Sequence, residues 1–400
     1  MNKLKAIEIL DSRGNPTIKT ILQTSCGVFE SSVPSGASTG KHEAKELRDK
    51  DLKRYNGKGV LKAVENIEKI IAPKILKQDF KDQEKIDKFL INLDKSKDKS
   101  KLGANAILAV SMVICRAGAA LKKVPLYLHI NKISQMDLKM PEPFFNVVNG
   151  GKHAAGNNLD IQEFMIKPEK QSFAENLRKG AETYHLLKKE IIKALGKSSV
   201  NIGDEGGYVP AFTNSKQVLD ILSLFKEVKI SLDCAASEFY KNKKYFLEGK
   251  KINTQELLGY YLELVNEFNV FSIEDPFDQE DWEGFSKMQE ELKDKVLIIG
   301  DDLLCTNLKR IKKAQDKKAC QGLLLKLNQI GTVTEAIKAA QLAKSYNWKI
   351  MVSHRSGETC DDFIADLAVG IGSDYIKSGA PARGERVAKY NRLLEIEQEL

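Results

Sequence analysis

The stretch VKISLD (228–233) is the first of six short apolar runs that each end in a chemically reactive side chain. The other five are VFSIE (270–274), VLIIGD (296–301), GLLLK (322–326), KIMVSH (349–354) and DYIK (374–377). Their ends lie 23 to 41 residues apart, close to the roughly 30 residues of one strand–helix unit in a (β/α)8 barrel of about 250 residues. The spacing therefore predicts an α/β protein whose C-terminal part is a TIM-like (β/α)8 barrel.

The reactive side chains at the ends of these runs are expected to meet. Barrel strands are parallel, and residues at their C-terminal ends point into one mouth. The six residues are Asp233, Glu274, Asp301, Lys326, His354 and Lys377. Three carboxylates, two lysines and a histidine in one pocket indicate a metal-dependent catalyst that removes a proton from carbon.

The chain of 400 residues is longer than one barrel requires, so a smaller domain is expected beside it. Strand-like segments at 17–23 and 27–33 predict an antiparallel hairpin. Apolar residues at helical spacing then predict helices at 42–49, 60–75, 83–93 and 103–121. We interpret residues 1–130 as an N-terminal α+β capping domain and 140–400 as the barrel, with the linker near Pro141 and Pro143.

The first part of the barrel is expected to be irregular. Residues 144–148 and 159–166 have the pattern of two successive strands, and the first long helix is predicted only after them, at 173–195. The strict alternation of strand and helix therefore begins later in the chain.

Composition argues against several classes of protein. The net charge is +8, but lysines alternate with acids, as in KDQEKIDKFL (81–90), which is typical of solvated helix faces rather than of a nucleic-acid interface. The six cysteines form no CxxC pair, which favours buried reduced thiols and no zinc site. The longest apolar stretch, 106–115, is shorter than the roughly 20 residues of a membrane span. The N-terminus lacks a secretory pattern, so we expect a soluble cytoplasmic protein.

Asp233, Glu274 and Asp301 are candidate metal ligands. Three carboxylates from neighbouring strands supply hard oxygen donors, which suit Mg²⁺, whereas zinc would favour histidine or cysteine. Each acid alone could instead be a helix N-cap or an ion-pair partner. Three of them in consecutive units favour the metal site.

Lys326 and Lys377 are candidate bases. A lysine in water has a pKa of about 10.4 and is a poor base at neutral pH, whereas burial and nearby cations favour its neutral form. The alternative role for either lysine is to neutralise the acid cluster. A lysine base at this position would take a proton from carbon next to a carboxylate, and metal ions would stabilise the resulting ene-diolate.

Two other loops carry candidate site residues. Arg355 and Ser356, in SHRSG (353–357), offer a guanidinium fork and a hydroxyl suited to a phosphate group, although such a sequence also occurs in ordinary βα loops. Glu205 lies in the glycine-rich turn GDEGG (203–207) and is a candidate acid.

The loop GASTGK (36–41) resembles a phosphate-binding Walker motif, since it follows a strand and precedes a predicted helix. It has three residues between its glycines where that motif needs four, and His42 follows the lysine in place of Ser or Thr. A mobile Ser/Gly loop that closes over a site is the better interpretation.

Together these features show a resemblance to the enolase family along the whole chain. The stretches that carry the resemblance are DSRGNPT (11–17), VPSGASTG (33–40), LGANAIL (102–108), NGGKHA (149–154), QEFMI (162–166), GDEGG (203–207), LDCAASEF (232–239), SIEDPF (272–277), GDDL (300–303), LLLKLNQIGT (323–332), SHRSGET (353–359), KSGAPARGER (377–386) and AKYN (388–391). The resemblance implies an enolase-type barrel with a ββαα start. It also implies reversible dehydration of 2-phosphoglycerate to phosphoenolpyruvate.

The resemblance also implies a role for each matching position. Lys326 would take the C2 proton, and Glu205, supported by Glu163, would deliver the proton with which the C3 hydroxyl leaves as water. Two Mg²⁺ ions would be bound in each site, one by Asp233, Glu274 and Asp301 and the other with the help of Ser38. The residues that would bind the substrate or line its pocket are His153, Gln162, His354, Arg355, Ser356 and Lys377.

The resemblance also bears on the oligomeric state, and two alternative functions are weighed against it. The family implies a homo-oligomer, either a dimer or an octamer. One alternative is another lyase or racemase of the superfamily, but such an enzyme would need neither the Ser38 loop nor GDEGG, so their presence favours enolase. Another alternative is a role in binding RNA or a protein partner, which the dispersed lysines disfavour. The segment from His153 to Glu163 is one residue longer than the family pattern.

Overall fold

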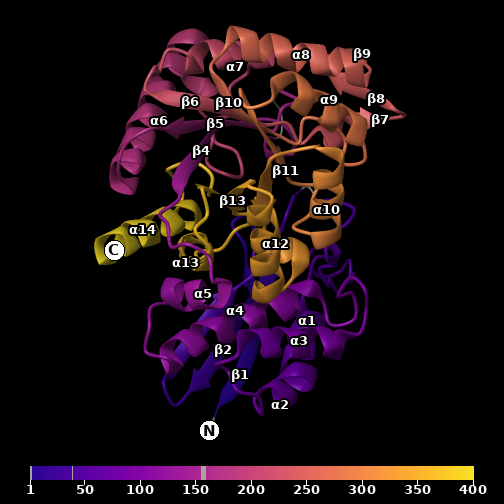
Figure 1. The fold of residues 1–400 in the computed structure, drawn as a ribbon, viewed down its shortest axis with the longest axis vertical. Helices are drawn as coiled ribbons and strands as arrows, with labels where there is room; N and C mark the ends of the chain where they lie inside the picture. The colour runs from indigo at the N-terminus through magenta and orange to yellow at the C-terminus, as the bar shows by residue number, and fades with distance from the viewer. Residues whose placement is uncertain (1, 38, 155–158) are drawn as a thin grey trace.

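Eight strands close a barrel in the C-terminal part of the molecule (Figure 1). The structure is a computed structural model that describes residues 2–37, 39–154 and 159–400. In order around the barrel, the strands are β4 (Glu142–Asn149), β5 (Glu163–Pro168), β6 (Val228–Asp233), β10 (Val270–Glu274), β11 (Leu297–Gly300), β12 (Gly322–Leu325), β13 (Lys349–Ser353) and β14 (Tyr375–Lys377), which pairs with β4. The barrel predicted from six apolar runs is confirmed.

The irregular start of the barrel is confirmed as well. Strand β5 is antiparallel to both β4 and β6, while the other neighbouring strands are parallel. Two helices, α6 (Phe173–Leu195) and α7 (Ser215–Leu222), follow before β6, so the order is ββαα. Because β5 is reversed, its first residue, Glu163, lies opposite Asp233 at the mouth of the barrel.

Helices on the outside of the barrel begin where side chains can satisfy the free backbone N–H groups of the first turn. The helices after β6 are α8 (Thr254–Glu267), α9 (Trp282–Leu292), α10 (Leu308–Lys317), α11 (Leu327–Ile330), α12 (Val333–Ser345), α13 (Phe363–Gly370) and α14 (Gly384–Glu399). The capping side chains that accept such an N–H are Ser172, Asn214, Asn253, Asp281, Asn307 and Thr332. A small antiparallel sheet of β7 (Tyr240–Lys241), β8 (Lys244–Leu247) and β9 (Lys250–Ile252) precedes α8.

Side chains fill the barrel interior. Buried residues from six of the strands form a cluster of their own, separate from the main core: Phe144, Met165, Leu297, Ile299, Leu324, Met351 and Tyr375. A filled interior leaves only the ends of the strands for polar chemistry. The functional site is therefore expected at the mouth.

The N-terminal part combines a three-stranded antiparallel sheet with five α-helices, and it lies below the barrel in Figure 1. Its elements are β1 (Lys3–Leu10), β2 (Pro16–Thr24), β3 (Gly27–Ser32), α1 (Leu61–Glu65), α2 (Ala72–Ile75), α3 (Gln83–Asp94), α4 (Ala104–Leu121) and α5 (Leu126–Ser134). The predicted hairpin is β2–β3, and β1 pairs with its other side. A π-helical stretch, Asn66–Ile71, joins α1 to α2 just before Pro73, which cannot donate the usual helical hydrogen bond.

The predicted helix at 42–49 is wrong, because these residues form an irregular segment. Backbone N–H groups that a helix would have used internally bond to distant partners instead. Ala44 donates to the carbonyl of Gln329, Lys45 to that of Asp98, and Leu47 to the Asn105 side chain. The Walker-like loop therefore does not lead into a helix, which removes a feature that a nucleotide phosphate site would need.

Helix α4 is the one helix in the described part of the chain that is long and apolar enough to cross a membrane, and 83% of it is buried within the molecule. It packs against β2 and β3, so its apolar faces serve the core. The cysteine prediction is only partly correct. All six thiols are free, but Cys26 and Cys360 are exposed rather than buried.

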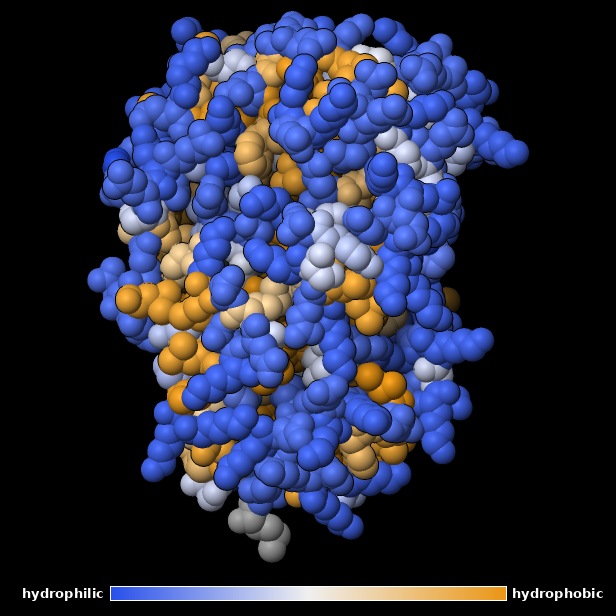
Figure 2. Space-filling model, in the orientation of Figure 1, coloured by the Kyte–Doolittle hydropathy of each residue, from blue (hydrophilic) through white to orange (hydrophobic). Residues whose placement is uncertain are grey.

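The face of the molecule drawn in Figure 2 is mostly polar. Figure 2 shows hydrophilic side chains over most of one face, with hydrophobic side chains in small separate groups. Many exposed charges are paired within the chain, such as Lys69 with Glu65 and Arg178 with Glu175 and Glu182. Such pairing agrees with the interpretation of the lysines as parts of solvated helix faces.

Arg116 on α4 is expected to be a major contributor to the stability of the fold. Its guanidinium donates to both carboxylate oxygens of Asp361, at 2.8 and 2.9 Å, and so joins the N-terminal part to the loop after β13. Burial is the largest single effect and raises the pKa of Asp361, but Arg116 together with the backbone N–H groups of Phe363 and Ser32 brings the pKa below its usual value. Arg116→Met should lower the free energy of unfolding by about 1.5–3 kcal/mol, because a partly buried carboxylate loses its charged partner and keeps only the backbone N–H groups of Ser32 and Phe363.

Urea unfolding followed by circular dichroism measures this change. The double variant Arg116→Met with Asp361→Asn should recover part of the loss. Arg178→Met, which removes two exposed ion pairs, should have no measurable effect. A loss for Arg116→Met as small as that of Arg178→Met would contradict the prediction.

Candidate active site

The ends of the barrel strands bring the six predicted side chains to one mouth. Three of them are the last residues of strands and three directly follow strands: Asp233 on β6, Glu274 on β10, Lys377 on β14, and Asp301, Lys326 and His354 after β11, β12 and β13. All are buried except Lys326, which is partly exposed. The convergence expected from parallel strands is present.

Lys377 lies at the centre of the acid cluster. Its Nζ is 3.1 Å from Asp233 Oδ2, 3.2 Å from Glu163 Oε2, and 2.8 and 2.9 Å from the two oxygens of Glu274. Burial lowers the pKa of Lys377, but these carboxylates raise it by more, to well above the usual range of a lysine. In this arrangement Lys377 is a permanent cation that neutralises acids, which is the alternative role considered for it.

Lys326 donates to Asp301 Oδ2 at 2.5 Å, and the other oxygen of Asp301 accepts from Gln329 Nε2 at 2.7 Å. Burial is the largest single effect and lowers the pKa of Lys326, but Asp301 and then Glu274 raise it, and the resulting pKa is above the usual value of a lysine. In this arrangement Lys326 is therefore a cation paired with Asp301, and its role as the base stays a prediction. Lys326 can act as a base only when Asp301 has another partner.

Two carboxyl groups and two imidazoles line the same pocket. His153 Nδ1 is 3.4 Å from Glu205 Oε1 and 3.5 Å from Glu163 Oε1, while His354 Nε2 is 3.4 Å from Glu205 Oε2. Asn146 donates to the same Glu205 oxygen at 2.9 Å. Burial, and after it the charge of Glu205, raises the pKa of Glu163 well above its usual range. A carboxyl pair of this kind titrates together and can hold one proton at neutral pH.

Arg355 presents its guanidinium beside the same pocket. Nη1 and Nη2 donate to the two oxygens of Glu43 at 3.1 and 3.2 Å, and Nη1 also donates to Asn328 Oδ1 at 2.8 Å. The neighbouring Ser356 Oγ is buried and has no hydrogen-bond partner among the described residues. A guanidinium next to a hydroxyl can bind the oxygens of a phosphate group, but here both Nη groups are paired with Glu43, so this pair must open first.

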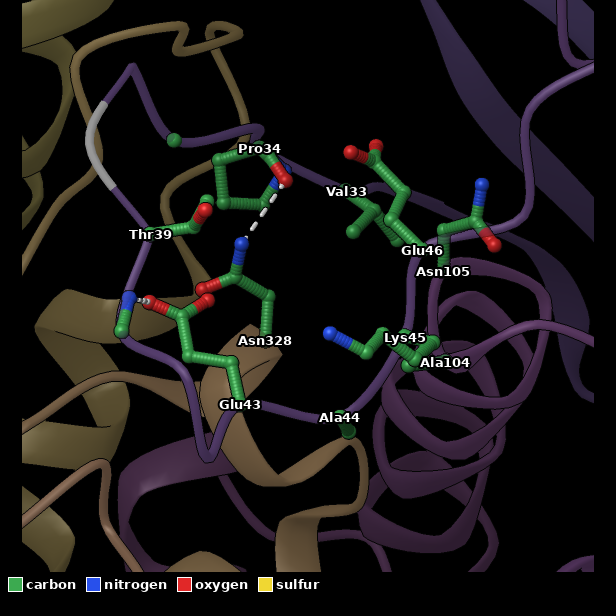
Figure 3. A pocket seen from close by; sticks show the side chains of 12 residues that line it. Val33, Pro34, Thr39, Glu43, Ala44, Lys45, Glu46, Ala104, Asn105 and Asn328 are labelled. Atoms are coloured by element: carbon green, nitrogen blue, oxygen red, sulfur yellow. Dashed lines mark hydrogen bonds between the residues drawn. The ribbon is translucent and has the colours of Figure 1, made fainter. Parts of the chain in front are cut away.

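A second pocket of about 220 Å³ is lined by Glu43 and Asn328, among other residues (Figure 3). Figure 3 shows Asn328 reaching the carbonyl of Pro34, at 3.2 Å, and Glu43 accepting from the backbone of Gly40, at 3.0 Å. The same two side chains hold Arg355. The segment around residues 34–40 is therefore connected to the candidate phosphate-binding arginine through Glu43 and Asn328.

The nine residues predicted to be catalytic or to bind substrate all line one small pocket: Glu163, Glu205, Lys326, His153, Gln162, His354, Arg355, Ser356 and Lys377. Asp233 lines this pocket too. Glu274 and Asp301 do not line it, but they accept hydrogen bonds from two residues that do, Lys377 and Lys326 respectively. The free volume is only about 10 Å³, so side chains or loops must move before a substrate can bind. Ser38 lies outside the described residues, as do 155–158 in the longer segment between His153 and Glu163.

The acid cluster has the chemistry of a site for a hard cation. Glu163, Asp233 and Glu274 share one lysine, and Asp275, Asp301 and Asp302 place carboxylate oxygens within 4.8 Å of one another. Buried carboxylates therefore outnumber the lysines that face them. Oxygen donors with excess negative charge fit Mg²⁺. Among the described residues, the groups whose ligand atoms converge within 4.8 Å are Asp275, Asp301 and Asp302, and His153, Glu163 and Glu205. Of the predicted ligands only Asp301 belongs to such a group, because Lys377 lies between Asp233 and Glu274, so the three-carboxylate metal site stays a prediction.

Several residues that shape the site were not predicted from the sequence. Glu43, Asn328 and Gln329 hold Arg355 or Asp301, and Arg386 contacts His354. Asp275 accepts the backbone N–H groups of Asp301 and Asp302. The only signal for Asp275 was its position next to Glu274 in SIEDPF.

Comparison with known proteins agrees with this geometry. Residues 1–130 match the family model "Enolase, N-terminal domain", and residues 137–400 match "Enolase, C-terminal TIM barrel domain". The chain is 53% identical over 404 aligned residues to an enolase of Methanocaldococcus jannaschii, covering 99% of this chain and 94% of that protein. The barrel, its buried mouth and these matches agree, and the chain belongs to the enolase family of hydro-lyases.

Proposed function

We propose that this protein catalyses the reversible, Mg²⁺-dependent dehydration of 2-phosphoglycerate to phosphoenolpyruvate. One observation carries the proposal: a single pocket is lined by Lys326 and by the neighbouring carboxyl groups of Glu163 and Glu205. Removal of water from a hydroxy acid needs a base for one proton and an acid for the leaving hydroxyl. The arginine fork of Arg355 lies beside both, where it can hold a phosphate.

The metal would be held by the residues that supply oxygen donors. Asp233, Glu274 and Asp301 would bind one Mg²⁺, and Ser38 would help to bind a second with the substrate. Bound Mg²⁺ supplies Lewis-acid stabilisation of the negative charge that builds up on the substrate carboxylate. Asp301 would then have a partner other than Lys326, and the effect that raises the pKa of Lys326 would weaken.

The side chains divide the proton transfers between two faces of the pocket. Lys326 Nζ takes the proton from C2 of the substrate. Glu163, whose pKa is raised by burial, holds the proton of the pair, whereas burial raises the pKa of Glu205 but its neighbours, chiefly His153 and His354, bring it well below its usual value. Glu205 passes this proton from Glu163 to the C3 hydroxyl, so that the C3–O bond breaks and water leaves. Lys377 stays cationic beside the carboxylate end, and Arg355 and Ser356 hold the phosphate.

Absorbance spectroscopy tests the proposed function directly. The purified protein with 2-phosphoglycerate and Mg²⁺ should show a rise in ultraviolet absorbance as the enol phosphate forms, and a chelator should abolish the rise. Folded protein that shows no rise with excess Mg²⁺ would refute the proposal. A protein that exchanges or inverts C2 of other acids without losing water would indicate a racemase of the same superfamily.

We also propose, from the family resemblance, that the protein acts in the cytoplasm as a homo-oligomer. Size-exclusion chromatography with light scattering would give the subunit number, and a monomer at micromolar concentration would contradict this part.

A further inference from the structure

Arg386, in the first turn of α14, is the largest fully buried side chain among the described residues. Its Nη1 lies 2.7 Å from His354 Nδ1 and donates to the carbonyl of Arg355 at 2.6 Å. Its Nη2 donates to the carbonyls of Asp204, at 2.9 Å, and Ser356, at 2.5 Å. One guanidinium therefore contacts the histidine, the candidate phosphate loop and the turn that carries the candidate acid.

The contact with Arg386 decides where the proton of His354 lies. A guanidinium has only N–H donors and no acceptor, so the ring nitrogen that faces it must be an acceptor. Nδ1 of His354 is therefore unprotonated, and the proton of the neutral ring is on Nε2. Burial, which lowers the pKa of His354 to about 3, agrees with a neutral ring.

The proton on Nε2 faces the candidate acid. Nε2 of His354 lies 3.4 Å from Glu205 Oε2, the oxygen that also accepts from Asn146 Nδ2 at 2.9 Å. The opposite tautomer would present a lone pair to this carboxyl group and an N–H to the Arg386 guanidinium. Both contacts would then be unfavourable.

We propose that Arg386 is a positioning residue that fixes His354 as the Nε2–H tautomer and so aims one N–H donor at Glu205. The inference rests on the proposed function, in which Glu205 is the acid. The other Arg386 contacts support the same role, because Asp204 precedes Glu205 and because Arg355 and Ser356 form the candidate phosphate loop. Arg386 therefore fixes the position of the Glu205 turn relative to the candidate phosphate loop, although Arg386 itself belongs to a helix that does not line the pocket.

The tautomer can be read directly by nitrogen-15 NMR. The chain has five histidines, so histidine-labelled protein gives few ring signals, and His354→Gln identifies those of His354. At pH 7, without substrate or metal, wild-type protein should show a protonated Nε2 and an unprotonated Nδ1. A His354 protonated on Nδ1, or on both nitrogens, would overturn the proposal without any variant of Arg386.

Arg386→Met removes every donor of the guanidinium and should give His354 a mixture of tautomers. The turnover number should fall about 10- to 100-fold, as is typical when a residue that orients a catalytic group is lost. Arg383→Gln is the matched control, since Arg383 is three residues away and contacts Glu385 and the Ser12 carbonyl but not His354. It should leave both the tautomer and the turnover number unchanged.

The two readouts separate a positioning role from a structural one. A lower turnover number with His354 still entirely in the Nε2–H form would overturn the proposal, and so would a tautomer change in Arg383→Gln. If Arg386→Met does not fold, the wild-type spectrum decides. Because that spectrum needs no turnover, an inactive wild-type protein would refute the proposed function while leaving the tautomer assignment intact.

Discussion

Lys326→Ala should lower the turnover number for 2-phosphoglycerate by about 10²- to 10⁴-fold, because the reaction loses its base. Lys326 is the lysine that can fill this role, since Lys377 is held as a cation by three carboxylates. The loss should appear in C2 proton exchange as well as in dehydration, because both need the same proton removed. Steady-state kinetics and deuterium wash-in at C2 measure the two effects.

Two controls accompany this variant. Lys326→Arg keeps a positive charge next to Asp301 but cannot release a proton at neutral pH, so it should be as inactive as the alanine variant while keeping a wild-type melting temperature. Lys312→Ala, on the exposed face of α10, should have no effect. An active Lys326→Arg enzyme would exclude Lys326 as the base.

Glu205→Gln should abolish dehydration much more completely than C2 exchange. Dehydration should fall by about 10²- to 10⁴-fold, because an amide cannot give a proton to the leaving hydroxyl. Glutamine has the shape of glutamate, and its carbonyl can still accept from Asn146 and His354. Lys326 is left in place, so the C2 proton should still exchange with solvent.

Deuterium wash-in at C2, compared with absorbance at the same enzyme concentration, separates the two steps. Glu283→Gln, an exposed residue on α9 that pairs with Lys287, is the matched control and should behave like the wild type. Equal loss of exchange and dehydration in Glu205→Gln would argue against Glu205 as the acid.

Local pattern was sufficient to predict most of the barrel. The six apolar runs became strands with nearly the expected bounds, since a strand buried on both faces has a continuous apolar sequence. Strand β1 was missed, although Leu4 and Ala6 are buried and alternate with the exposed Lys3 and Lys5. The predicted helix at 42–49 failed because its backbone bonds to Gln329, Asp98 and Asn105, which no local pattern could reveal.

In the candidate site, too, some features were predictable from the sequence and others depend on tertiary contacts. The sequence by itself determined the barrel rhythm, the family resemblance and the reactive side chains at the strand ends, because apolar periodicity and motifs are properties of neighbouring residues. Only the tertiary structure decided which side chains pair with each other. Lys377 pairs with three carboxylates, and Lys326 pairs with Asp301. Arg355 pairs with Glu43, and Arg386 contacts His354. These partners lie 25 to 312 residues apart, and the charge and tautomer of a buried group depend on what folding places within hydrogen-bond distance.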